Sequence, residues 1–127
     1  MKIEVIELGL IKGRHSLPVE NYILEESEVD VFTKKEIEPL IIKGLKRMGI
    51  ECYFTYEAFE EIITVDKNNQ EVNQEDIHLI KLYITGLTIV TLTAVEVLHD
   101  WGYTVEIMGF NPNTQEYYSQ GIFNKYC

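Results

Sequence analysis

Three basic side chains lie close together near the start of the chain, at Lys12, Arg14 and His15. The planar guanidinium of an arginine suits a phosphate or a carboxylate, and a histidine can exchange a proton near neutral pH. The chain has 21 acidic and 11 basic residues and a formal net charge of −10, so a basic cluster stands out. We therefore expect this loop to contribute to an anion-binding site. The alternative is a surface loop that forms local ion pairs with Glu20 or Glu25.

A second candidate for anion binding is the segment Thr85-Gly86-Leu87-Thr88, which follows an apolar run and precedes a helical pattern. The free N–H groups and the positive end of a helix attract an anion, and two threonine hydroxyls add donors. We expect Thr85, Gly86 and Thr88 to contact the ligand. They would face the Lys12 loop if the first strand lies beside the central one. The alternative is ordinary helix capping by Thr85 or Thr88.

The third candidate site is an acidic stretch. Between Glu51 and Ile80 there are eight carboxylates and one basic residue, Lys67. Such a surface can dock on a basic site of another protein, or it can simply keep the protein soluble. If it binds a partner, the expected contacts are the carboxylates of Glu57, Glu60, Glu61 and Asp66.

A metal centre and a thiolate site are both poorly supported. Glu96, His99 and Asp100 share one helical turn, but a histidine there also complements the helix dipole, and zinc needs a further well-placed ligand. The two cysteines, Cys52 and Cys127, form no Cys-x-x-Cys pair. We expect no metal and no cofactor, and the chain has no GxGxxG, P-loop, GxSxG or HExxH motif.

The elements that must position these residues can be predicted from the apolar pattern. The first strand is expected over residues 2–11. Thr33 and Glu36 have the spacing of a capping box, but Pro39 implies that the helix ending near Gly49 either begins at Pro39 or is kinked there. Residues 50–65 alternate as two extended segments before a turn at 66–70.

The second half of the chain predicts a strand-helix-strand unit followed by a hairpin. The near-continuous apolar run at 77–84 is typical of a central strand buried on both faces. A helix follows to Trp101, then strands at 103–110 and 115–123. The expected fold is a single α/β (or α+β) domain over 1–127, with a mixed sheet of about five to six strands and two main helices.

Composition limits the function classes. The net charge disfavours direct binding to nucleic acid, which depends on lysine and arginine contacts to phosphates. The longest apolar stretch, 87–98, carries three threonines and Glu96, so we expect no membrane span. The acidic start of the chain does not fit a signal peptide, and the low cysteine content fits a cytoplasmic protein.

The segments 12–18, 83–88 and 113–118 resemble those of small phage and prophage proteins. The strand-helix-strand layout is similar to Rossmann-like sensors and ring nucleases that bind cyclic oligonucleotides in CRISPR systems. It is equally similar to phage proteins that sequester nucleotide second messengers in anti-Thoeris or anti-CBASS defence. The resemblance implies an accessory protein of a mobile element, with no residue roles carried over.

Together these patterns predict a non-enzymatic cytoplasmic protein that binds a small anionic ligand such as a nucleotide second messenger, as a homo-oligomer. One alternative is an acidic interaction module that inhibits a host protein by docking on a basic site. A further alternative is a cyclic-oligonucleotide phosphodiesterase with His15 as acid or base.

Overall fold

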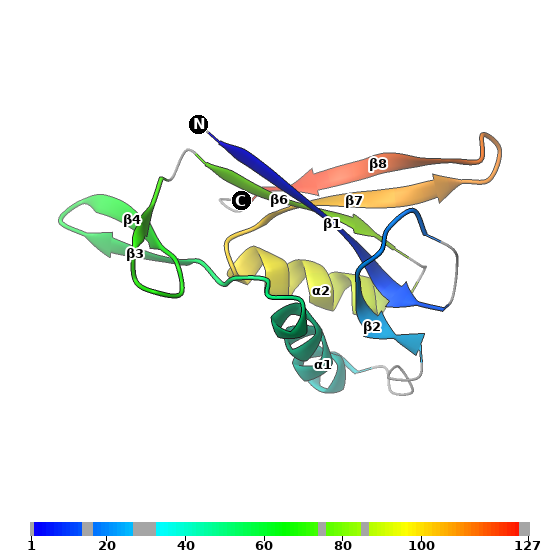
Figure 1. Ribbon diagram of the computed structural model, residues 1–127, viewed down its shortest axis with the longest axis horizontal. Helices are drawn as coiled ribbons and strands as arrows, with labels where there is room; N and C mark the ends of the chain where they lie inside the picture. Colours follow the sequence, from blue (N-terminus) through cyan, green and yellow to red (C-terminus); the bar gives the residue numbers. More distant parts are fainter. Residues whose placement is uncertain (1, 14–16, 27–32, 74–75, 85–86, 125–127) are drawn as a thin grey trace.

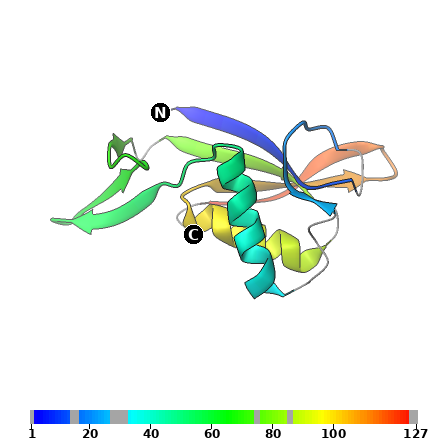
Figure 2. The ribbon, with the colours of Figure 1, turned by 60° about the horizontal axis from the view of Figure 1, so that its bottom comes forward.

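Five strands form the main sheet, in the order β2-β1-β6-β7-β8, and both helices lie on one of its faces (Figures 1 and 2). The computed structural model describes residues 2–13, 17–26, 33–73, 76–84 and 87–124. The elements are β1 (Ile3–Lys12), β2 (Tyr22–Glu25), α1 (Lys34–Arg47), β3 (Phe54–Ala58), β4 (Glu61–Val65), β5 (Glu71–Val72), β6 (Ile77–Tyr83), α2 (Thr88–Asp100), β7 (Thr104–Asn111) and β8 (Glu116–Phe123). The predicted α/β class is confirmed, as are the mixed sheet of about five strands and the two main helices; a second sheet of three strands is present in addition.

The direction of the connections explains why the helices share a face. Strands β2, β1, β6 and β7 are parallel, and β8 is antiparallel to β7. The connections from β2 through α1 to β6, and from β6 through α2 to β7, both run toward the β8 edge. Because such crossovers are right-handed, both helices must lie on the same side of the sheet. The connection from β1 to β2 runs the other way and therefore crosses the opposite face.

The core fills the space between the sheet and the helices. Alternate residues of the central strands point to the helices and are fully buried, as Leu8, Ile80 and Val105 illustrate. Helix α2 packs between the sheet and α1, which explains why its sequence is apolar nearly all round (Figure 2). Burial of this kind offsets the weak helix propensity of its β-branched residues.

Helix α1 begins where the capping-box spacing predicts, but its start differs in detail. Thr33 is the N-cap residue, yet its hydroxyl donates to the Glu36 carboxylate at 2.8 Å rather than accepting from a backbone amide. The helix also continues through Pro39 instead of starting there. Ile37 and Ile41, on either side of the proline, are buried in the core, so packing stabilises the turn that the proline weakens.

Strand β2, which the sequence did not predict, is joined to α1 by a close contact. A Cβ atom on Gly44 would lie 2.1 Å from the carbonyl oxygen of Ile23, so only glycine permits this approach. The Arg47 guanidinium donates to the carbonyl oxygens of Tyr22 and Ile23, at 3.3 and 3.2 Å. These contacts give two carbonyl groups of the edge strand β2 a partner on α1.

Strands β3, β4 and β5 form a separate antiparallel sheet that projects from the main sheet, and we call it the arm (Figure 1). It matches the two extended segments and the turn predicted between 50 and 70. The turn between β3 and β4 consists of Phe59 and Glu60, both with positive φ, 51° and 69°. In the turn between β4 and β5, the Asp66 carboxylate accepts from the backbone amides of Asn68 and Gln70.

Candidate functional site

The carboxyl ends of β1 and β6 lie side by side in the main sheet. These strands pair in parallel from Ile3 with Ile77 to Gly9 with Tyr83, and β1 then continues for three residues to Lys12. From there the chain leaves β1 toward β2 across one face, and it leaves β6 toward α2 on the other face. This is a topological switch point, where open α/β sheets form a crevice that binds ligands.

The two predicted anion-binding segments were expected to face each other only if the first strand lies beside the central strand. The structure meets this condition, because β1 pairs with β6. Lys12 is exposed at the end of β1, and Thr88 is exposed at the start of α2. Arg14, His15, Thr85 and Gly86 lie outside the described residues, so their positions remain predictions.

Carboxylates also lie beside the basic loop. Lys12 pairs in register with Glu25 of the neighbouring strand, and a Cβ atom on Gly13 would lie 3.2 Å from a carboxylate oxygen of Glu26. This arrangement favours the alternative of local pairing for Lys12. The net positive charge of the site therefore depends on Arg14 and His15.

The start of α2 has no cap from the side chain of its N-cap residue. Leu87 is the N-cap residue, and its side chain has no oxygen to accept a bond from the first amides. Thr88 is the first helical residue, so it does not cap the helix as the alternative supposed. A hollow of about 180 Å³ beside it is lined by Ile84, Thr88, Thr91 and Leu92. The Thr91 hydroxyl donates to the Leu87 carbonyl oxygen at 3.1 Å, which leaves the Thr88 hydroxyl as the exposed polar group.

An aromatic cluster lies at the same edge of the sheet, on the face opposite the helices. The rings of Tyr83 and Tyr117 are 5.3 Å apart, and those of Tyr117 and Phe110 are 5.1 Å apart. Burial raises the pKa of Tyr83, and the nearby Glu7 carboxylate, which accepts a hydrogen bond from its hydroxyl, raises it further. Phe110 is half exposed, so the cluster has an accessible ring next to the switch point.

The acidic residues singled out in the sequence lie on the arm. Glu57, Glu60 and Glu61 are exposed around its tip. The Asp66 carboxylate instead holds the β4–β5 turn, which makes it a structural group. Phe59 is 99% exposed at the tip. The tip therefore combines three carboxylates with a bare aromatic ring.

Two residues of the cluster Glu96, His99 and Asp100, in the last turns of α2, have partners of their own. Glu96 pairs with Lys34 at 2.6 Å, and a ring nitrogen of His99 lies 2.9 Å from the carbonyl oxygen of Asn124. Across the described parts of the chain, no group of three metal-ligating side chains comes together.

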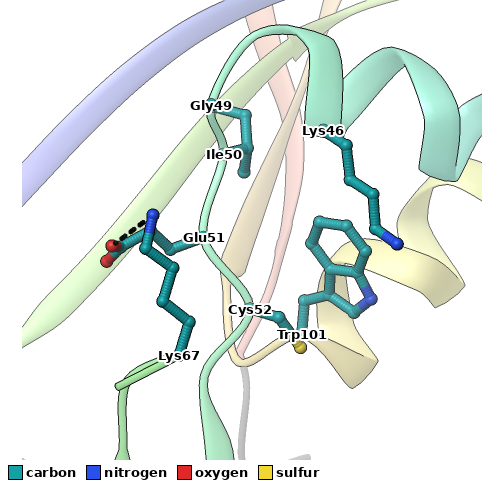
Figure 3. A pocket seen from close by; sticks show the side chains of 7 residues that line it. All are labelled: Lys46, Gly49, Ile50, Glu51, Cys52, Lys67 and Trp101. Carbon is teal, nitrogen blue, oxygen red and sulfur yellow. Dashed lines mark ion pairs between the residues drawn. The ribbon is translucent and has the colours of Figure 1, made fainter. Parts of the chain in front are cut away.

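A pocket that the sequence did not indicate lies between the ends of the two helices (Figure 3). It has a volume of about 260 Å³ and is lined by Lys46, Gly49, Ile50, Glu51, Cys52, Lys67 and Trp101. Lys67 pairs with Glu51 at 3.5 Å, whereas Lys46 extends beside the Trp101 indole. Burial raises the pKa of the Cys52 thiol, so it stays protonated at neutral pH and is a poor nucleophile.

Comparison with protein-family models, curated proteins and solved structures finds no significant match to this chain. None of the helices among residues 33–73 and 87–124 is long and apolar enough to cross a membrane.

Proposed function

We propose that the protein is a non-enzymatic binder of a small anionic ligand, such as a nucleotide second messenger, at the switch point between β1 and β6. The observation that carries the proposal is the parallel pairing of these two strands, whose chains leave toward opposite faces. This pairing brings the end of β1 at Lys12 and the end of β6 at Tyr83 to one edge of the sheet. It supports a shared site for the basic loop and the start of α2.

The chemistry at this edge suits a nucleotide. Arg14 and His15 would contact phosphate, the amides around Gly86 and the Thr88 hydroxyl would add donors, and an aromatic ring such as Phe110 would stack on a base. In a cytoplasmic accessory protein of a mobile element, tight binding without turnover would sequester the messenger.

The test is calorimetric titration with three probes, AMP, a cyclic dinucleotide and cyclic tetra-adenylate. For the probe that binds, Arg14→Ala should raise Kd by about tenfold or more, since a charge-assisted hydrogen bond is worth ~1.5–3 kcal/mol. Thr88→Val should raise Kd by only a few-fold. Lys2→Ala is the matched control, because Lys2 is exposed just before β1, at its amino end.

Three outcomes would contradict this proposal. The first is that none of the probes binds. The second is that Arg14→Ala and Thr88→Val bind the probe as tightly as the wild type. The third is steady hydrolysis of a cyclic oligonucleotide that is lost in His15→Ala, which would make the protein a phosphodiesterase.

A second candidate function is supported by the arm, which would dock on a basic site of another protein. Its tip is exposed, acidic and aromatic, and the two residues of its turn have a backbone conformation that L residues rarely adopt. Strain of this kind is often kept at functional positions. For a captured partner, we expect Kd to rise steeply with salt and binding to be abolished by Glu60→Lys with Glu61→Lys. A complex insensitive to salt would contradict this function.

A further inference from the structure

The face of the main sheet opposite the helices leaves apolar side chains uncovered along its amino-terminal half. Ile3 and Val5 on β1 are 58% and 49% exposed, and Ile122 on β8 is 56% exposed. Their positions in the strand register place them on one face, together with the half-buried Leu79 of β6. The other half of this face is covered, because Tyr22 and Val19 pack over Gly9.

Parallel strands rarely leave a face open. Sheets built from them are found almost only with both faces covered, and their strands are apolar on both sides. Strand β6 has this pattern, with Leu79 on the open face and Ile80 in the core. The two helices lie on the other face, and the β1–β2 connection reaches only the carboxyl end. Within the part of the chain that the structure describes, the open half has no cover.

The size of the open half fits a small, weak interface. It spans six residues of β1 and of β6, but only the first four of β7 and the last three of β8. With strands ~4.8 Å apart and ~3.3 Å per residue, this is a flat patch on the order of 300 Å². Two copies packed face to face would bury about 600 Å² of it, so the contact should depend on protein concentration.

The charged residues on this face are arranged so that two copies of the face can form ion pairs with each other. Glu7, Lys81, Glu106 and Ile122 form one row across β1, β6, β7 and β8. Lys81 lies 4.0 Å from Glu106 within the chain, and the Glu7 carboxylate already accepts a hydrogen bond from Tyr83. A twofold axis parallel to the strands and between β6 and β7 would place Lys81 of each copy against Glu106 of the other. The same axis would set β1 of one copy over β8 of the other, which places Glu7 opposite Ile122 at the edge of the contact and leaves Leu79 near its middle.

We propose that this open sheet face is an interface with a second copy of the chain, in an isologous dimer with reciprocal contacts between Lys81 and Glu106. The inference is independent of the ligand site, because the switch point and Lys12 lie at the opposite, carboxyl end of the sheet.

The test is sedimentation velocity of the full chain over a range of concentrations, with charge-reversal variants. Wild type should be a dimer. Lys81→Glu and Glu106→Lys should each raise the dimer dissociation constant by about tenfold or more, because each places like charges across the interface. An equimolar mixture of the two variants should recover the dimer, since opposite charges would then face each other at both of the reciprocal contacts. This recovery cannot come from a fold defect in either variant.

Val5→Glu and Phe59→Glu form the matched pair for the apolar contact. Both replace an exposed apolar side chain, but only Val5 lies on the open face. We expect Val5→Glu to be monomeric and Phe59→Glu to remain a dimer. A monomeric wild type overturns the proposal. So does a dimer that persists in Val5→Glu and Lys81→Glu, a dimer that is lost in Phe59→Glu, or a mixture of the two charge variants that fails to associate.

Discussion

The main sheet with its helices and the projecting arm differ in where their apolar side chains lie. In the main sheet, residues such as Leu8, Ile80 and Leu82 are buried against α2, within one contiguous core. In the arm, Phe54, Ile62 and the tip residue Phe59 are exposed. A side chain contributes to stability by the area that it removes from water. The main sheet should therefore determine whether the chain folds, while the arm is free to bind.

The largest expected effect comes from shortening a buried side chain of the main sheet. Ile80→Ala should lower the free energy of unfolding by about 3 kcal/mol, because the side chain is fully buried and its loss leaves a cavity. Ile62→Ala in the arm should change it by less than about 0.5 kcal/mol. Urea denaturation of both variants measures the difference. Similar losses would show that the arm and the main sheet share one core.

A smaller effect is expected where α1 meets β2. Gly44→Ala places a methyl group 2.1 Å from the backbone carbonyl oxygen of Ile23, so the helix must shift away from the sheet. We expect a loss of about 2 kcal/mol, even though alanine favours a helix. Gly121→Ala in β8 is the control, because the new methyl group would meet no described atom within 4 Å. Thermal unfolding of the pair would contradict the close approach if both variants melted alike.

The elements of this fold could be predicted where the apolar pattern runs over many residues. They were missed where a strand depends on a partner that is far away along the chain. Helix α2 and strand β7 follow from periodicity, and their bounds agree within one or two residues. Strand β2 has only four residues. It is stabilised by its pairing with β1 and not by a strand pattern in its own sequence. Pro39 predicts a helix start or a kink by local rules, but the helix begins before it, because the burial of Ile37 and Ile41 stabilises the first turns.

The candidate site shows the same division. The residue types at Lys12, Arg14 and Thr88 predict an anion site, because such chemistry follows from residue type alone. The pairing of β1 with β6 cannot be predicted from the sequence, because their first paired residues, Ile3 and Ile77, are far apart in the chain. The Trp101 pocket was also missed, since it forms only where the ends of α1 and α2 meet.

Two tyrosines at the amino end of the core provide a test by pH. Burial raises the pKa of Tyr53 to about 12 and also raises that of Tyr103, both from an ordinary value near 10. The unfolded chain then loses these protons at a lower pH than the folded chain. Stability is therefore fully present below pH ~10 and falls as the pH rises from there toward 12.

Tyr103→Phe tests this assignment. Its hydroxyl donates to the Glu51 carbonyl oxygen at 2.8 Å, so the variant should lose about 1–2 kcal/mol at neutral pH. Its stability should then fall less steeply than that of the wild type above pH 10. Tyr56→Phe on the arm is the control and should change stability by less than about 0.5 kcal/mol. A Tyr103→Phe variant with the slope of the wild type would contradict the assignment.

The smallest expected effect on global stability comes from the tip of the arm. Phe59 and Glu60 both have positive φ in a two-residue turn, a conformation for which Asn-Gly is preferred. The double variant Phe59→Asn, Glu60→Gly should stabilise the hairpin locally by about 1 kcal/mol, and slow hydrogen exchange at the paired amides of β3 and β4. Global unfolding in urea should stay within about 0.5 kcal/mol of the wild type, because the core does not include this turn. If the global free energy rises as much as the local protection, the arm unfolds together with the main sheet. If the turn relaxes but a captured partner binds as before, the strained aromatic tip is not what the partner contacts.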